Sequence, residues 1–180
     1  MKVSLARIVL FVVLTHTAFG AARVTSSLYA LSNKASTFTV GVIMALFALV
    51  PALLAVRAGR WLDEVGPFKP LALGTGLMTV GVLLPMSFPF VVADVAPLLV
   101  SSAMIGTGFM YLQLTTQNLV GELADPGRRP AAFSMLALGF STSGLIAPVT
   151  SGFLIDSVGH RPTFALIFAL LAISTALLWT

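Results

Sequence analysis

The 180-residue sequence has very little charge. Charged residues make up 9% of the chain and hydrophobic residues 58%, whereas ordinary soluble domains average about 25% and 45–50%. A soluble fold of this length would need far more polar surface to cover its core. The composition therefore excludes a water-soluble domain and predicts that most of the surface faces a lipid bilayer.

Cysteine is absent as well, which rules out disulfides and thiol chemistry but does not fix the compartment. Two histidines and six acidic residues offer no convincing metal cluster, and no glycine series has the strand-to-helix context of a nucleotide site. We therefore expect no metal, no cofactor and no enzymatic activity. An alternative is an intramembrane serine hydrolase using Ser141 or Ser143 with His16, because residues 139–143 resemble a nucleophile elbow without its final glycine.

Alternating polarity of the kind found in membrane barrels is missing too. Instead the sequence contains long uncharged runs, and a helix needs about 20 apolar residues to cross the hydrocarbon core. The first run is short but can span when the amphipathic residues 4–27 are included. No linker divides the chain, so we predict one all-α integral membrane domain over residues 1–180. Its six transmembrane helices correspond to the uncharged runs 8–22, 35–56, 70–93, 95–121, 130–155 and 162–180.

The basic residues are distributed unevenly between the two predicted sides. Because basic residues in short loops mark the cytoplasmic side, an N-terminus inside places most of them there. Arg23, Lys34 and Arg161 fall toward the other side. The net charge of +4 is thus a topology signal and does not indicate a nucleic-acid partner. The predicted cytoplasmic set is Lys2, Arg7, Arg57, Arg60, Lys69, Arg128 and Arg129.

The N-terminus has a second interpretation. Lys2 and Arg7 precede an apolar stretch and then small residues up to Ala22, which is the pattern of a secretory signal peptide. The remaining five runs span the membrane under either interpretation. If the first helix is not cleaved, the chain has an even number of spans, which agrees with the distribution of the basic residues.

Two of the predicted connections resemble each other. Residues 58–66 read AGRWLDEVG and residues 151–159 read SGFLIDSVG, so Gly59 and Gly152 lie 93 residues apart. This spacing predicts two three-helix repeat units, about 1–93 and 94–180. An odd number of spans inverts the second unit relative to the first. Inverted repeats are an architecture of secondary transporters.

The connection after the second helix carries a family motif. Gly59, Asp63, Gly66 and Lys69 form the pattern Gly-x3-Asp-x2-Gly followed by a basic residue, and the chain resembles one six-helix half of the major facilitator superfamily. The resemblance implies that this loop takes part in gating between alternating-access states. Glycine at 59 permits close backbone approach, and Asp63 can face the positive end of the next helix.

The sequence also departs from the family pattern. Glu64 stands where many members have a basic residue, and Pro67 and Phe68 replace part of the basic cluster. Four residues before Gly106, where members often have an arginine, this chain has Ser102. The resemblance therefore does not extend to proton coupling through that arginine.

The fifth helix resembles an element of antiporter members. Ser143, Ala147, Pro148, Ser151 and Gly152 match a degraded Gly-Pro-x-x-Gly-Gly pattern, and Pro148 predicts a bend. Small residues also serve close helix packing, which is the simpler interpretation. The antiporter interpretation favours efflux.

Ionisable residues inside membrane helices are costly, so each is a candidate for function. His16 lies near the predicted midplane, and Arg23 lies seven residues on, on the same helical face. Together they could line a transport cavity, where Arg23 attracts an anionic group. Alternatively, His16 bonds a neighbouring helix and Arg23 snorkels to the interface.

The fourth helix supplies further polar candidates. Gln113 and Gln117 lie four residues apart on one face, with Asn118 beside them. At these positions the side-chain amides either bind a polar substrate or form hydrogen bonds to a neighbouring helix. A group of glycines instead predicts close helix packing, namely Gly74, Gly76, Gly81, Gly106 and Gly108.

Together these features predict transport of a small solute by alternating access, with the bacterial inner membrane as the location implied by the resemblance. Family members carry two such halves around the substrate site. The chain could accordingly be a fragment, a half that pairs with itself as a homodimer, or one that pairs with a separate half. The competing hypothesis is a non-transporting membrane fragment or assembly partner. The sequence names no substrate, direction or coupling ion.

Overall fold

The computed structural model describes residues 5–87 and 95–179 of the chain, and these residues form helices joined by short turns. Six of them are long and apolar enough to cross a membrane, which confirms the predicted all-α fold. Lys2 and most of the predicted connection at 88–96 lie outside the described residues. The helices are α1 (Leu5–Ser32), α2 (Thr37–Val65), α3 (Phe68–Ser87), α4 (Ala96–Leu123), α5 (Arg129–Val158) and α6 (His160–Trp179), with a short 3-10 helix at Pro126–Arg128 before α5.

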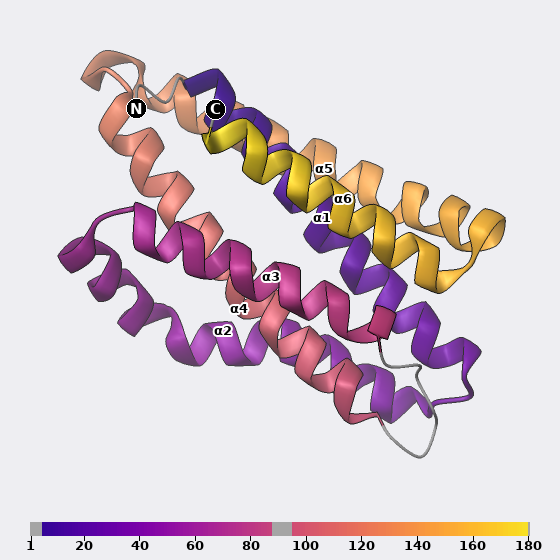
Figure 1. Ribbon diagram of the computed structural model, residues 1–180. Coiled ribbons are helices and arrows are strands. Elements are labelled where there is room, and N and C mark those ends of the chain that lie inside the picture. The colour runs from indigo at the N-terminus through magenta and orange to yellow at the C-terminus, as the bar shows by residue number, and fades with distance from the viewer. Residues whose placement is uncertain (1–4, 88–94, 180) are drawn as a thin grey trace.

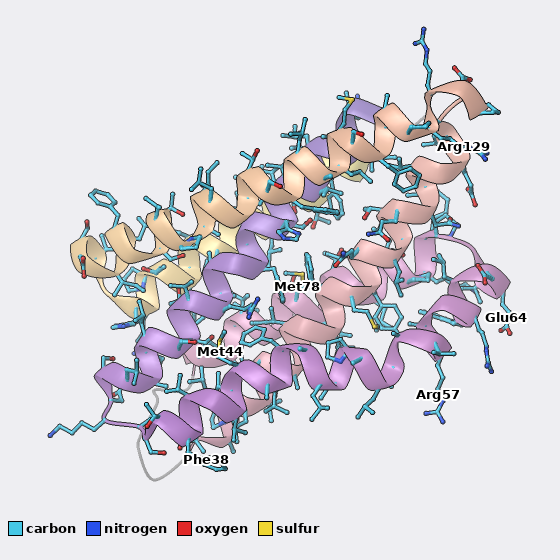
Figure 2. The ribbon with its side chains drawn as sticks, turned by 180° about the vertical axis from the view of Figure 1, so that it is seen from behind. Phe38, Met44, Arg57, Glu64, Met78 and Arg129 are labelled. Atoms are coloured by element: carbon cyan, nitrogen blue, oxygen red, sulfur yellow. The ribbon has the colours of Figure 1, made fainter. Side chains whose placement is uncertain are left out.

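Successive helices run in opposite directions, so the start of α1 and the end of α6 lie at the same end of the bundle (Figure 1). The turns from α2 to α3 and from α4 to α5 lie at that end as well (Figure 1). α1 contacts α4, α5 and α6, while α4 contacts α2 and α3. These two helices are therefore central, with α3 and α6 along one side and α2 and α5 along the other (Figure 2).

Glycines let α4 approach its neighbours closely. A Cβ added to Gly108 would lie 2.6 Å from the Gly74 carbonyl oxygen of α3, and one added to Gly81 would lie 2.7 Å from the Ile105 side chain. Four of the five glycines predicted to mark close packing therefore do so, the fourth being Gly106. Gly76 does not, because a Cβ there would meet nothing within 4 Å.

The contact between α2 and α4 involves a proline as well as a glycine. Pro51 lies inside α2, and because proline has no N–H, the carbonyl of Phe47 loses its helical donor. A Cβ on Gly106 would overlap that same carbonyl. α4 thus meets α2 at a point where the α2 backbone lacks one of its own hydrogen bonds.

A stripe of small residues on α5 packs against α1. Gly139, Ser143, Ala147 and Ser151 follow one another at intervals of four and are buried, and a Cβ on Gly20 of α1 would lie 2.8 Å from the Ala147 side chain. The Ser143 hydroxyl donates to the Val13 carbonyl of α1 at 3.0 Å. Packing therefore accounts for this serine, and its engaged hydroxyl argues against Ser143 as the nucleophile of the hydrolase alternative.

The two turns with similar sequences also have similar geometry. Gly66 ends α2 with φ 76° and ψ 178°, and Gly159 ends α5 with φ 89° and ψ 173°. Their N–H groups donate to Leu62 and Ile155 carbonyls at 3.0 Å and 2.9 Å respectively. Both glycines and both acceptors are 93 residues apart, which agrees with the predicted repeat. The boundaries of the repeat units stay a prediction.

Candidate functional site

One face of α1 presents a series of polar and aromatic side chains near the middle of the bundle. His16, Phe19 and Arg23 are spaced by three and four residues, so they lie on the same face of the helix. Ser27 continues this face one turn further on. Phe19 is close to the midpoint of α1, which runs from Leu5 to Ser32. Two cavities open beside this face.

The first cavity, here called the Arg23 cavity, has a volume of about 400 Å³. α1 lines it from His16 to Leu28, α2 contributes Met44, and α5 contributes residues 144–148 in part. The Ser27 hydroxyl lies 3.0 Å from the Met44 sulfur, and Met44 is marked on α2 in Figure 2. The cavity therefore combines a largely apolar wall with two ionisable side chains, His16 and Arg23.

His16 is packed among aromatic rings. Its ring centroid lies 4.9 Å from that of Phe109 in α4 and 4.9 Å from that of Phe140 in α5. The Nδ1 atom is buried and has no hydrogen-bond partner among the described residues. The alternative in which His16 bonds a neighbouring helix is therefore not supported at this nitrogen.

Arg23 points back along α1 toward the middle of the bundle. Its guanidinium carbon lies over the Phe19 ring, 5.7 Å from the centroid, and Phe19 is four residues nearer the N-terminus. Helical side chains lean in that direction, and a cation over an aromatic face is attracted to it. A side chain that snorkelled would extend toward Ser32 instead, so this contact favours the cavity interpretation of Arg23 over the snorkelling one.

The second cavity, here called the glutamine cavity, has a volume of about 370 Å³. It is an open cavity lined by Phe19 of α1, by α2 around Pro51 and by α4, including both Gln113 and Gln117. In α2 it reaches Ala55, beyond the middle of that helix. Because α2 runs opposite to α1, this cavity extends toward the end of the bundle where α1 begins, whereas the Arg23 cavity extends toward the other end.

Phe19 lines both cavities. Its ring stacks on that of Phe109, with centroids 3.9 Å apart and planes 6° from parallel. Phe47 of α2 meets the same ring edge-on, at 5.9 Å. An aromatic group from three helices therefore stands where the two cavities adjoin, near the middle of the bundle.

The predicted site residues fall into separate groups. His16 and Arg23 share one cavity together with Pro148, while Gln113 and Gln117 line the other. Gly152 lines neither cavity. The predicted gating residues, Gly59, Asp63, Gly66 and Lys69, lie around the turn from α2 to α3, at one end of the bundle.

Sequence reasoning passed over the aromatic residues of the site. Phe19 lies three residues after His16 and four before Arg23, so helical spacing already put it on the same face. Phe47, Phe109 and Phe140 carried no comparable signal, because a phenylalanine in a membrane helix ordinarily faces lipid or core. Only the packing of α2, α4 and α5 around α1 brings their rings to the cavities.

The acidic side chains that the structure describes line neither the Arg23 cavity nor the glutamine cavity. Asp63 and Glu64 lie in the last turn of α2, Glu122 in the last turn of α4 and Asp156 in the last turn of α5. Asp125 lies just before the short helix at Pro126–Arg128. Among the described residues, therefore, no carboxylate lies at the depth of Arg23 to neutralise its charge.

Comparison with known proteins gives a consistent result. The family model described as Major Facilitator Superfamily matches residues 8–180. Multidrug resistance protein 1 of Bacillus subtilis (strain 168) is 28% identical over 135 residues, which cover 74% of this chain and 33% of that protein. The chain thus spans about a third of the length of this relative.

Solved structures of transporters share the fold. A POT family transporter in complex with a thioalcohol-conjugated peptide superimposes with a TM-score of 0.81 at 19% identity, covering 96% of this chain and 37% of that one. A mutant of a peptide transporter POT in complex with alafosfalin gives a TM-score of 0.82 at 21% identity, covering 97% and 37%. At these identities the likeness concerns the fold, and it corresponds to one half of an MFS-type transporter.

Proposed function

The chain belongs to the major facilitator superfamily, and we propose that it moves a small solute across the membrane by alternating access, together with a second six-helix half. The family and the structural relatives are transporters, so membrane transport is the function class. The solute, the direction and the second half are the proposed parts. The competing hypothesis of a non-transporting assembly partner has no comparable support among the cavities described above.

The observation that carries the proposal is the pair of cavities on either side of Phe19. Alternating access requires a central site that opens to one side of the membrane at a time, and transporters place this site near the bilayer midplane. The Arg23 cavity and the glutamine cavity meet at the midpoint of α1 and extend toward opposite ends of the bundle. We propose His16, Arg23, Gln113 and Gln117 as the polar residues along this path.

The proposed second half covers the side formed by α2 and α5. α2 is the least buried of the six helices, and Leu53 in its middle is 72% exposed. On α5, Leu145 is 71% exposed and Phe153 is 70% exposed. The chain corresponds to 37% of the length of the transporters it superimposes on, which supports a second half of similar size on this side.

The turn between α2 and α3 is the proposed gating element. Gly59 was expected to allow close backbone approach, yet a Cβ there would meet nothing within 4 Å in this chain. The same is true of Gly152 in α5. We propose that the group approaching Gly59 belongs to the second half, and that Asp63 and Lys69 act with it at the same end of the bundle.

The direction of transport and the orientation in the membrane are further parts of the proposal. The antiporter-like element of α5 and the name of the Bacillus relative, a multidrug resistance protein, support export. We place the protein in the bacterial cytoplasmic membrane with its N-terminus inside. The labelled residues Arg57, Glu64 and Arg129 lie at one end of the bundle (Figure 2), and the predicted excess of basic residues at that end marks it as cytoplasmic.

Cysteine labelling tests alternating access without a known solute. Because the chain has no cysteine, Ser27→Cys reports on the Arg23 cavity and Ala55→Cys on the glutamine cavity. In inside-out and right-side-out vesicles, a membrane-impermeant maleimide should label Ala55→Cys from the cytoplasmic side and Ser27→Cys only from the other. Labelling of both positions from the same side would contradict the proposal.

The second half is tested by native mass spectrometry of the purified protein in nanodiscs. We expect a complex containing twelve spanning helices, either a homodimer or the chain with a separate half. Leu145→Glu, on the exposed side of α5, should weaken that complex, whereas Ile173→Glu, exposed on α6, should not. A monomer that carries out no transport would favour the assembly-partner hypothesis instead.

A further inference from the structure

Arg23 is a cation within the membrane-spanning part of α1, and none of the carboxylates that the structure describes lies beside it. It lies nine residues before the end of α1 at Ser32, which corresponds to about 13 Å along the helix axis. Charged side chains at such depths are costly unless they are paired. Its Nε atom is buried and has no hydrogen-bond partner among the described residues.

Within residues 5–87 and 95–179, the neighbourhood of Arg23 offers an aromatic contact but no counter-ion. The Phe19 ring faces the guanidinium carbon at 5.7 Å, and the other ionisable side chain of the Arg23 cavity is His16. The described carboxylates lie at or just beyond helix ends. The electrostatic character of this cavity is therefore positive, and its most favourable occupant carries a negative charge.

The rest of the cavity is apolar. Met44, Leu28, Val24 and Pro148 contribute to its wall beside Phe19, and its volume of about 400 Å³ falls in the range of about 300–1,000 Å³ that small-molecule sites occupy. An inorganic anion would satisfy Arg23 and leave this apolar wall uncovered. A molecule that joins one anionic group to an apolar body would satisfy both.

We propose that the Arg23 cavity binds amphipathic organic anions, compounds with a carboxylate, sulfonate or phosphate group next to an apolar or aromatic body. The anionic group pairs with the Arg23 guanidinium, and the body packs against Phe19 and the wall formed by α2 and α5. This inference rests on the proposed function, because it names the class of solute that the transporter accepts.

A membrane lipid carries the same chemistry, so its headgroup is the other source of such an anion. The depth of the site argues for a solute. With 28 residues, α1 is about 42 Å long, which exceeds the hydrocarbon core of about 30 Å. A centred α1 therefore places the Arg23 backbone about 8 Å inside the core boundary, and the side chain points further inward toward Phe19. A lipid would have to draw its headgroup into the hydrocarbon region to reach this side chain.

A matched series of probes tests the proposal in nanodiscs of phosphatidylcholine. Naphthoate, naphthamide and naphthylmethylammonium share one apolar body and differ in charge, and equilibrium dialysis gives the affinity of each for the purified protein. We expect naphthoate to bind at least about tenfold tighter than the amide, as a charge-assisted bond predicts, and the ammonium probe to bind most weakly. Equal affinities for the three probes would overturn the proposal.

Variants of Arg23 test whether this side chain causes the preference for naphthoate. Arg23→Gln should reduce naphthoate binding to the level of the amide, while Arg23→Lys keeps the charge and should retain most of the preference. Lys34→Gln is the matched control, because it removes a cation at the same end of α1 but outside the cavity. A preference for naphthoate that survives Arg23→Gln would also overturn the proposal.

Phosphatidylglycerol in the nanodisc distinguishes the two sources of the anion. Unchanged naphthoate affinity supports a solute site, whereas a loss that depends on Arg23 would assign the site to lipid and overturn the solute form of the inference. Binding is measured here without transport. Failure of this test therefore leaves alternating access untouched, and failure of the cysteine labelling leaves the anion preference standing.

Discussion

The ring of Phe19 in α1 lies flat against the ring of Phe109 in α4, with centroids 3.9 Å apart and planes 6° from parallel. The two residues come from the middle of the two central helices. Phe19 also lines both cavities, while Phe109 lines the glutamine cavity. The stacked pair thus occupies the position through which a solute would pass from one cavity to the other.

Removing this stack should connect the two cavities. Phe19→Leu keeps an apolar side chain but loses the flat contact, at a cost of about 0.5–1.5 kcal/mol in the α1–α4 interaction. We expect Ala55→Cys in this background to react with impermeant maleimide added from either side of the membrane. Phe133→Leu, which changes an exposed ring of α5 outside both cavities, should leave one-sided labelling intact. One-sided labelling in the Phe19 variant would show that another group separates the cavities.

Gly106→Ala should destabilise the bundle where α4 meets α2. The added methyl group would overlap the Phe47 carbonyl oxygen, and backbone atoms cannot rotate away as a flexible side chain could. The expected loss is about 1–3 kcal/mol of unfolding free energy, measured by denaturant titration in detergent micelles.

Gly76→Ala is the control for that experiment. Nothing lies within 4 Å of a Cβ at Gly76, and alanine is favoured over glycine inside a helix by about 0.5–1 kcal/mol. The control should therefore be neutral or slightly stabilising. Equal losses in both variants would mean that the close contact at Gly106 does not contribute to stability.

Gly66→Ala and Gly159→Ala should each cost stability for a conformational reason. Both residues have positive φ with ψ near 180°, a region that residues other than glycine enter at a cost of about 1–3 kcal/mol. The two turns lie at opposite ends of the bundle (Figure 1), so the losses should add in the double variant. Thermal unfolding in detergent measures all three variants, and a neutral Gly66→Ala would contradict the assigned backbone.

Gly59→Ala should separate folding from assembly. Because a Cβ there meets open space within this chain, the isolated six-helix protein should keep its stability. If the second half approaches this position, the variant should lower association, measured as the fraction of complex in native mass spectra. Unchanged association would exclude Gly59 from the interface.

Ser143→Ala removes a hydrogen bond between α5 and α1. The hydroxyl donates to the Val13 carbonyl at 3.0 Å, and such bonds between membrane helices average about 0.6 kcal/mol. We expect a loss of that size in denaturant unfolding. Ser141→Ala, on the exposed side of the same helix, is the control and should be neutral. A larger loss at Ser141 than at Ser143 would reverse the assignment of the packing face.

The sequence alone determined the class and the architecture of this protein. Low charge and six uncharged runs required helices that satisfy their own backbone groups in lipid. The motif at Gly59, Asp63 and Gly66 pointed to the family. The first helix extends further than its uncharged run, to Ser32, because the run was bounded by Arg23 and charge alone does not end a helix.

Parts of the candidate site were predictable from spacing within single helices. His16 and Arg23 share a helical face because they lie seven residues apart, and Gln113 and Gln117 share one because they lie four residues apart. Spacing within one helix could not show that the histidine–arginine pair and the glutamine pair line different cavities. It also allowed Arg23 to snorkel outward, because the direction of a long side chain depends on its neighbours.

Only the tertiary structure decided those questions. The rotation and depth at which α2, α4 and α5 pack on α1 bring Phe47, Phe109 and Phe140 to its polar face, and they leave Arg23 over the Phe19 ring. Small residues at the helix contacts, namely Gly20, Gly106 and Ser143, determine how closely these helices pack. Helix formation in lipid is a local requirement that composition encodes, whereas the site arises from contacts between residues far apart in the chain.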